Sequence, residues 1–378
     1  MTPVSWNRML VLLVVMALSS PLVQAQDRKG IGLTLTNHTG FILKHTDKLT
    51  FTPPPVSSGL EVSFTHRTHG QKNWEAWNRY PVFGINAIWI DLGSDELGHA
   101  FGAYPFVDVP LFHHQQWSGY AQIGSGLAWL TKRFDRIRNP LNNAIGSNLN
   151  NSAAFRIHVD YRWRPDWLFT GGLSFTHFSN GQAQTPNYGI NVIGGMIGAQ
   201  WVPHPLASSD YQPATEPKTP LRRFGLSTYA NLAFREHFTF GGPRYPVYIA
   251  SLAGLYQFSR INRLHVGLEY EYNQGIYTFS KLNWQIQGDN ARRWAASRLM
   301  VFVADEFLFG NWAILVQAGT YIGGFGEFIP LPVYNKLALR YYLPYLPWTN
   351  ARFFGGLTLK SHMITAEYIA LGMGVTFD

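Results

Sequence analysis

Apolar and polar residues alternate with a period of two through most of the chain. In residues 155–163 the odd positions carry aromatic or aliphatic side chains and the even positions carry ionisable ones, and residues 263–273 again show one apolar and one polar face. Side chains two positions apart on a strand point to the same side of a sheet. A soluble β-sandwich would also alternate, but its apolar faces would need a partner sheet. Many such segments in an aromatic-rich chain favour a transmembrane β-barrel, whose apolar face contacts lipid.

The alternation predicts about sixteen strands in two runs of eight, separated by the Pro-rich, polar residues 203–223. The first run lies near residues 32–46, 58–68, 80–92, 98–112, 116–131, 152–164, 167–179 and 188–202, and the second near 224–236, 245–259, 262–276, 296–308, 311–322, 335–343, 353–362 and 364–377. We therefore predict an all-β fold and favour a single antiparallel transmembrane barrel of about 14–16 strands. The alternative is an eight-stranded barrel followed by a second barrel.

The amino-terminal residues have the features of an export signal. Arg8 precedes the apolar run MLVLLVVMAL, and residues 23–25 (VQA) offer a small-residue cleavage site. A membrane anchor is the competing interpretation, but the run is shorter than the roughly 20 residues that a spanning helix needs. We predict a signal peptide at 1–25, a first barrel region at 26–202, a periplasmic connection at 203–223 and further barrel strands at 224–378.

The composition narrows the possible functions. Charged residues make up 14% of the chain, below the roughly 25% that is usual in soluble domains. The absence of cysteine excludes a small disulfide-bonded scaffold. The formal net charge of +8 is compatible with an anionic partner. The sequence contains no Cys/His metal spacing, phosphate-binding glycine loop or nucleic-acid module, so we expect no cofactor, no metal and no nucleic-acid partner.

A histidine and a serine lie two positions apart at the end of the segment 167–179. His177 and Ser179 share the odd, apolar face of this segment, so they are expected to face lipid rather than the barrel interior. Short connections at 113–115 and 164–166 and a long one at 130–151 place this strand end at the outer rim, because outer-membrane barrels have long external loops. The pair is either a catalytic dyad or two polar residues at headgroup level.

The surrounding motif resembles a known family. Residues 177–181 (HFSNG) followed by 186–191 (PNYGIN) resemble the signature of the PagL-type lipid A 3-O-deacylases, which are outer-membrane barrels. Residues 39–202 are similar to long, Bacteroidetes-like members labelled acyloxyacyl hydrolase-like, through stretches that include GFILKH at 40–45 and NPLNNAIGS at 139–147. The resemblance implies a serine hydrolase that removes an ester-linked acyl chain from lipopolysaccharide in the outer leaflet of a Gram-negative outer membrane.

The resemblance also implies roles for individual residues. Ser179 would be the nucleophile and His177 the base that accepts its proton, because a serine hydroxyl needs an adjacent base. The family has a glutamate fourteen residues after the histidine to orient the ring, whereas this chain has Asn191. An asparagine can orient a histidine but cannot stabilise the imidazolium by charge. Asn180 and the backbone N–H of Gly181 are placed to bind an oxyanion.

A cationic loop and the polar faces of the strands give two further predictions. Lys132, Arg133, Arg136 and Arg138 could pair with lipid A phosphates, or could be solvated loop residues. The rival functions are a non-enzymatic porin or transport barrel and an inactive relative that lacks the carboxylate. The transport hypothesis rests on the ionic faces formed by Arg156, His158, Asp160, Arg162, Glu269 and Glu271. In small barrels such residues fill the interior instead.

Overall fold

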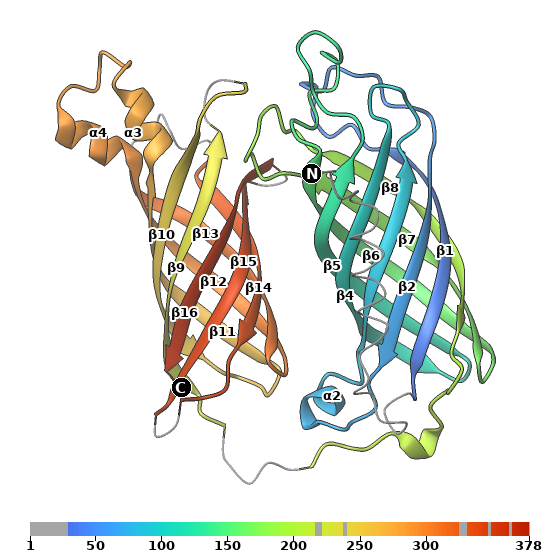
Figure 1. Cartoon of the computed structure of the whole chain (residues 1–378). Coiled ribbons are helices and arrows are strands. Elements are labelled where there is room, and N and C mark those ends of the chain that lie inside the picture. Colours follow the sequence, from blue (N-terminus) through green and yellow to red (C-terminus); the bar gives the residue numbers. More distant parts are fainter. Residues whose placement is uncertain are drawn as a thin grey trace, which may run out of the picture.

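The chain folds into sixteen strands that form two closed antiparallel barrels (Figure 1). The computed structural model describes residues 29–215, 221–236, 240–324, 331–346, 349–362 and 365–377, so the predicted signal peptide lies outside the described residues. The first barrel consists of β1 (Ile31–Ile42), β2 (Ser57–Arg67), β3 (Val82–Asp91), β4 (His99–His114), β5 (Trp117–Leu130), β6 (Leu149–Arg164), β7 (Trp167–Ser179) and β8 (Ile190–Trp201). The second consists of β9 (Phe224–Glu236), β10 (Arg244–Tyr256), β11 (Asn262–Asn273), β12 (Ser297–Phe309), β13 (Trp312–Gly324), β14 (Val333–Tyr342), β15 (Ala351–His362) and β16 (Thr365–Phe377).

The all-β barrel class is confirmed, but the strands close into two barrels, as in the alternative prediction. β8 pairs back onto β1, from Leu33 opposite Trp201 to Ile42 opposite Val192. β16 pairs in the same way with β9. Our preference for a single large barrel was therefore wrong. With β1 and β8 paired to each other, neither has a free edge left to pair with a strand of the second half.

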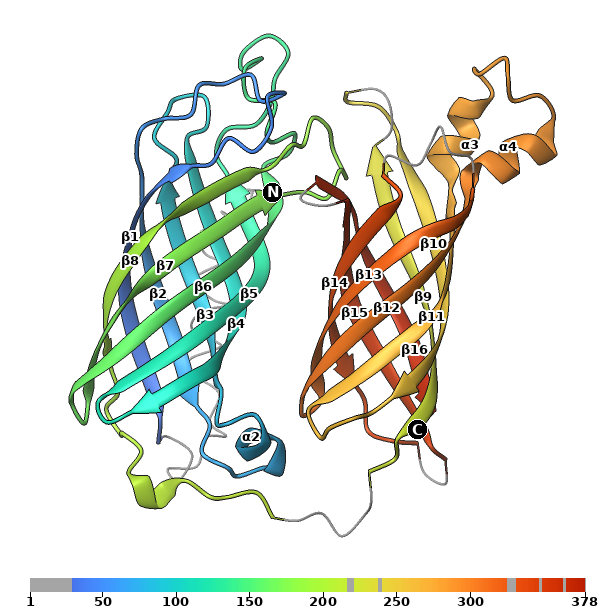
Figure 2. The ribbon, with the colours of Figure 1, turned by 180° about the vertical axis from the view of Figure 1, so that it is seen from behind.

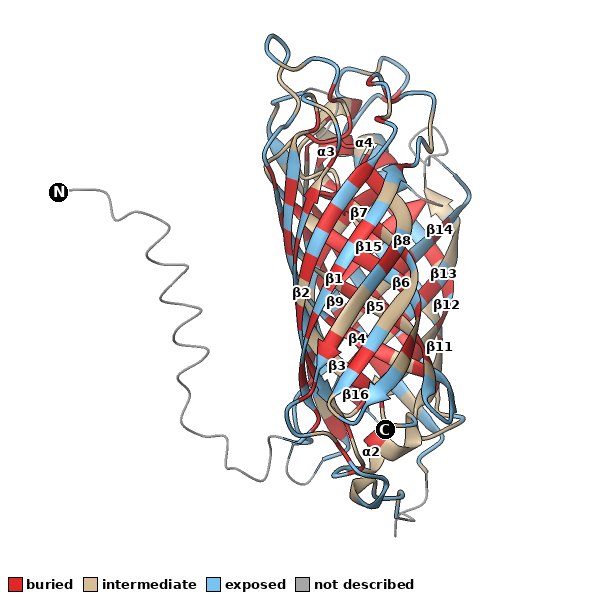
Figure 3. Ribbon diagram, turned by 90° about the vertical axis from the view of Figure 1, so that its right-hand side faces the viewer, coloured by how far each residue is buried: buried red, intermediate tan, exposed pale blue. Residues whose placement is uncertain are grey.

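Burial along the strands follows the predicted alternation (Figure 3). In β6 the polar residues Arg156, His158 and Asp160 are buried, while Phe155 and Ile157 are exposed. Exposed apolar side chains on an outward face are expected where that face contacts lipid. The interior of each barrel is accordingly polar.

Side chains that form ion pairs occupy the interior of the first barrel. Arg156 donates to Glu61 at 2.7 Å, and Tyr104 donates to the same carboxylate at 2.9 Å. Arg67 donates to Asp160 at 2.9 Å. Buried charges are tolerated when they are paired and hydrogen-bonded. These residues therefore fill a closed interior.

The interior of the second barrel is also filled with ion pairs. Lys360 lies 2.7 Å from Glu271 and 3.1 Å from Glu367, and Lys336 lies 2.5 Å from Glu269. A further buried cluster groups Glu306 with Arg263, His265, Arg340 and Tyr342. Both lysines are fully buried, so each depends on its carboxylate partner.

In the described part of the chain, three short α-helices lie between strands, and none of them was predicted. α2 (Asn73–Trp77) lies between β2 and β3, and α3 (Gln274–Ser280) and α4 (Asp289–Ala296) lie between β11 and β12. α3 and α4 project from one end of the second barrel, on the side away from the first (Figures 1 and 2). Among the residues described, no helix combines the length and apolarity needed to cross a membrane.

The two barrels lie side by side (Figure 2), and hydrogen bonds join them at both ends. At one end, Asn78 beyond α2 donates to the carbonyl of Leu308 at 3.0 Å. At the other end, the backbone N–H of Glu236 in β9 donates to the carbonyl of Gln182 at 3.0 Å. Gln182 belongs to the loop after β7, so the second barrel reaches the loop that follows His177 and Ser179.

Candidate active site

Strands β7 and β8 bring the predicted histidine and asparagine together. His177 and Asn191 are register partners in this antiparallel pair. The Nδ1 atom of His177 lies 2.6 Å from the Oδ1 atom of Asn191. The adjacent residues Phe178 and Ile190 are buried in the core cluster of the first barrel, whereas the next residue on the His177 face, Phe175, is partly exposed. His177 therefore lies on the outward face, as the strand alternation predicts.

A second histidine extends this pair. The Nδ2 atom of Asn191 lies 2.9 Å from the Nδ1 atom of His45, and the Nε2 atom of His45 lies 3.0 Å from the carbonyl oxygen of Tyr188. His45 follows β1, which is the neighbour of β8. The stretch GFILKH at 40–45 carried part of the family resemblance, but no role was predicted for His45. The sequence alone gives no signal for this role, because the contact joins two residues that are 146 positions apart in the chain.

Ser179 lies two residues beyond His177, at the last position of β7. Its side chain is buried, with 2% of the residue exposed. Within the described structure no hydrogen bond joins Ser179 to His177. Catalytic hydrogen bonds are often long or misaligned before substrate binds. The placement of Ser179 beside His177 on one strand is thus compatible with a dyad that forms in the substrate complex.

A glycine gives the His177 ring its space. Gly189 has a backbone φ of 84°, which side-chain-bearing residues rarely adopt. A Cβ atom at this position would lie 2.6 Å from Cε1 and 3.4 Å from Nε2 of His177. The edge of the ring that carries Nε2 therefore packs against the backbone of Gly189, in a conformation that only glycine adopts without strain.

The loop after β7 contains the predicted oxyanion residues. The side-chain amide of Asn180 donates to Ser147 Oγ and to the Gln184 carbonyl, both at 2.8 Å. The backbone N–H of Asn180 donates to Asn187 Oδ1 at 3.0 Å. The donors of Asn180 are thus engaged in holding the loop. Asn187 Nδ2 is buried and has no partner among the described residues.

Gly181 lies where this loop meets the second barrel. Its φ is 60°, and a Cβ atom would lie 2.6 Å from Cγ1 of Ile369 in β16. No described acceptor takes the backbone N–H of Gly181. Its role as an oxyanion donor stays a prediction.

The cationic loop between β5 and β6 also contacts the site loop. The Gly189 N–H donates to the Ala144 carbonyl at 2.9 Å. Backbone N–H groups of Arg138 and Ile137 donate to Asp135 and lower the pKa of its carboxyl below the usual value. Lys132, Arg133, Arg136 and Arg138 are exposed, and the Arg136 side chain donates to the Phe240 carbonyl at 3.1 Å.

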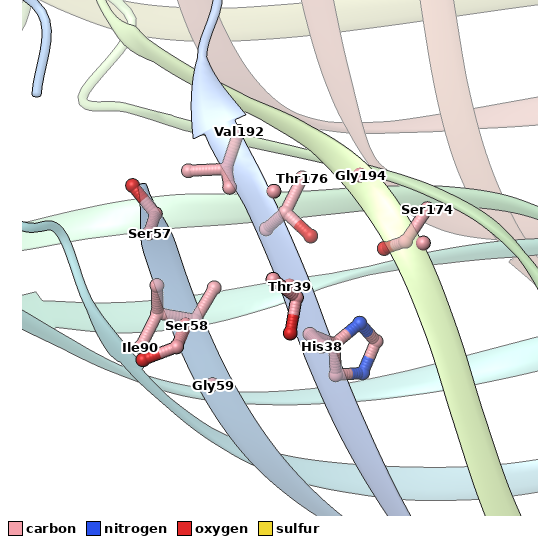
Figure 4. Close-up of a pocket in the computed structure, with 12 residues that line it drawn as sticks. His38, Thr39, Ser57, Ser58, Gly59, Ile90, Ser174, Thr176, Val192 and Gly194 are labelled. Carbon is pink, nitrogen blue, oxygen red and sulfur yellow. The ribbon is translucent and has the colours of Figure 1, made fainter. Parts of the chain in front are cut away.

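A pocket in the wall of the first barrel lies apart from these residues (Figure 4). Its lining includes His38, Ser174, Thr176 and Val192. Thr176 and Val192 are neighbours of His177 and Asn191 in sequence, so their side chains point to the other side of the sheet. The pocket is therefore not the predicted site. Among the described residues there is also no group of His, Asp or Glu side chains that could hold a metal ion.

Comparison with known proteins identifies the family. A family model described as lipid A 3-O-deacylase (PagL) matches residues 58–200, and one described as acyloxyacyl hydrolase, C-terminal domain, matches residues 223–378. The chain belongs to the PagL-type family. The predicted family is confirmed, and each family model falls on one of the two barrels. The family description denotes a lipid A ester hydrolase, which is the general class that the site residues predict.

Other comparisons add little. No curated protein matches the chain. Among solved structures, a mutant of the Rh. blastica porin is 13% identical, with 92% of this chain and 99% of that chain covered and a TM-score of 0.20. The translocator domain of the autotransporter NalP from Neisseria meningitidis is 9% identical, with 98% and 95% covered and a TM-score of 0.19. Similarity at this level supports no conclusion about function.

Proposed function

We propose that this protein hydrolyses an ester-linked acyl chain of lipid A in the outer membrane of a Gram-negative bacterium. The observation that carries the proposal is the contact between His177 Nδ1 and Asn191 Oδ1 on the outward face of the first barrel, two residues from Ser179. This arrangement leaves Nε2 of His177 as the basic nitrogen. A base of this kind is what a serine nucleophile requires.

The chemistry follows the serine hydrolase pattern. Ser179 Oγ attacks the ester carbonyl carbon while Nε2 of His177 takes the hydroxyl proton. The tetrahedral intermediate collapses, the bond to the sugar oxygen breaks, and His177 returns the proton to that oxygen, which leaves as an alcohol. Water then attacks the acyl-serine with His177 again as base. The fatty acid departs and Ser179 regains its proton.

Backbone and amide N–H groups next to Ser179 would stabilise the oxyanion. The Gly181 N–H remains the first candidate, as the sequence predicts. Because the amide of Asn180 already holds the loop, the buried and unpartnered Asn187 Nδ2 is the better second donor. Removing one such donor typically lowers turnover by about 10²–10³-fold.

The surroundings of the site fit a membrane substrate. On the membrane side of His177 and Asn191, the outward row of the wall consists of Phe41, Phe175 and Ile193, which are adjacent in register. An acyl chain in the outer leaflet could pack against this apolar row without leaving the bilayer. The exposed cations at 132–138 are then available to lipid A phosphates above it.

The rival functions predict other features. A transport barrel needs an open interior, whereas five of the six ionic residues cited for it are buried and paired inside two eight-stranded barrels, and the sixth, Arg162, is exposed near the end of β6. An inactive relative would need no ordered partner for His177. The contact between His177 and Asn191 therefore favours a working enzyme over both.

Mass spectrometry of lipid A tests the proposal. Cells that produce the wild-type protein should lose one acyl chain from lipid A, and cells that produce Ser179→Ala should not. Ser174→Ala is the matched control, because Ser174 lies on the same strand and points to the pocket on the other side of the wall. Identical acyl patterns for wild type and Ser179→Ala would refute the hydrolase function.

A further inference from the structure

We infer that His45 is a positioning residue that compensates for the missing family carboxylate by fixing the side-chain amide of Asn191. This inference rests on the proposed function. A carboxylate can only accept a hydrogen bond from His177, whereas an asparagine can present either its oxygen or its NH₂ group. Only the oxygen holds the proton on Nδ1 of His177 and leaves Nε2 free to act as base. Something must therefore select the orientation of Asn191.

The contacts of His45 make this selection. The carbonyl oxygen of Tyr188 can only accept, so Nε2 of His45, 3.0 Å away, must carry a proton. In a neutral imidazole the other nitrogen then accepts, and Nδ1 of His45 lies 2.9 Å from Nδ2 of Asn191. Asn191 must donate to His45 through its NH₂ group. Its oxygen is thereby turned to His177, at 2.6 Å.

The backbone holds His45 in place for this role. The N–H of Leu43 donates to the carbonyl of Asn191 at 2.8 Å, which extends the pairing of β1 with β8 past the end of β1. Tyr188 lies immediately before β8. Three adjacent strands thus hold a chain of hydrogen bonds that links Tyr188, His45, Asn191 and His177. The Tyr188 carbonyl ends this chain and can only accept, so it sets the direction of each hydrogen bond.

The inference predicts that His45 matters only while residue 191 is an amide. With a glutamate at position 191, the oxygen that faces His177 is an acceptor in every orientation. Loss of His45 should then have little further effect on the tautomer of His177. A purely structural role of His45 would instead give the same loss in both backgrounds.

A double-mutant cycle on the full-length protein in detergent micelles tests this coupling. His45→Phe should lower lipid A deacylation at saturating substrate by about 10–100-fold, the loss that follows removal of the partner that orients a metal-bound histidine, with little change in the half-saturating concentration. His45→Gln can still accept from Asn191 and donate to Tyr188, so it should retain more activity than His45→Phe. In the Asn191→Glu background, His45→Phe should have less than a threefold effect.

A spectroscopic measurement tests the inference without relying on activity. The ¹⁵N shifts of histidine-labelled protein, assigned with His177→Gln, should show the Nδ1–H tautomer of His177 in the wild type and a mixture in His45→Phe. An unchanged tautomer in His45→Phe, or an equal loss of activity in both backgrounds of the cycle, would overturn the role of His45. If instead Ser179→Ala is as active as the wild type, the proposed function fails while the tautomer result still decides the role of His45.

Discussion

The two barrels share one construction but differ in what lies on their walls. Each closes with eight strands and buries its charged residues in paired clusters. Only the first carries a histidine and serine two positions apart, so that both share the outward face. In the second barrel Ser361 and His362 are adjacent at the end of β15, and His362 contacts Tyr321 inside the barrel at 2.8 Å. Spacing along the strand, rather than residue type, separates the proposed catalytic pair from a structural contact.

The comparison predicts its largest difference for the two serines. Ser179→Ala should lower lipid A deacylation by about 10⁴-fold or more, because the nucleophile of a serine hydrolase acts as one unit with its base. Ser361→Ala should leave the rate unchanged, since the Oγ of Ser361 accepts a hydrogen bond from Asn335 and lies in the wall of the other barrel. Initial rates on purified lipid A in micelles provide the measurement. Equal losses for both variants would contradict the assignment of the chemistry to the first barrel.

The next largest effect concerns stability rather than turnover. Lys360→Met removes the cation between Glu271 and Glu367, which keep Arg298 as a shared partner. It should lower the free energy of unfolding by about 3–5 kcal/mol, because each carboxylate loses one of its buried ion pairs. Urea unfolding followed by tryptophan fluorescence measures the change. The folded variant should still deacylate lipid A at the wild-type rate, since the interior of the second barrel does not touch His177. A loss of turnover without a loss of stability would show that this interior serves the reaction.

In both barrels the sequence predicts the strands better than it predicts their closure. All sixteen strands were predicted to within a few residues, because alternation is a local property of each strand. The closure of the strands into two barrels was not the favoured prediction, because the pairing of Leu33 with Trp201 joins strands at opposite ends of the first run. His177 and Asn191 were placed together from the β7–β8 hairpin, whereas His45 requires the β1–β8 contact that only closure creates. The engagement of Asn180 by Ser147 depends likewise on a distant loop.

A contact between the barrels gives the third prediction. The buried carboxylate of Glu236 in β9 accepts hydrogen bonds from the backbone N–H and the hydroxyl of Thr185, the latter at 3.0 Å. Glu236→Ala leaves this N–H without its acceptor, which costs about 1–3 kcal/mol of loop anchoring. The loop that carries Gly181 and Asn187 should loosen. If this raises the activation free energy by about 1.4 kcal/mol, turnover falls roughly tenfold. Glu236→Gln keeps an acceptor oxygen and should retain most of the activity.

The matching control separates loop anchoring from general damage. Arg244 makes a long hydrogen bond of 3.4 Å to the Gln184 side chain in the same loop, so Arg244→Met should change turnover little. Unfolding midpoints of all three variants should lie close to that of the wild type. If Glu236→Ala is fully active, the second barrel does not support the site through this contact.

The smallest expected effect tests the cationic loop. Arg138 is exposed in the loop whose Ala144 and Ser147 contact the site loop, and Arg162 is an exposed arginine near the opposite end of the first barrel. Arg138→Ser should raise the half-saturating lipid A concentration by about two- to fivefold with unchanged turnover, because an exposed ion pair contributes about 0.2–1 kcal/mol. The effect should fade at high salt, which screens exposed charges, and with lipid A that lacks phosphates. Arg162→Ser should change neither parameter, and an equal shift for both arginines would mean that the loop has no specific part in binding phosphate.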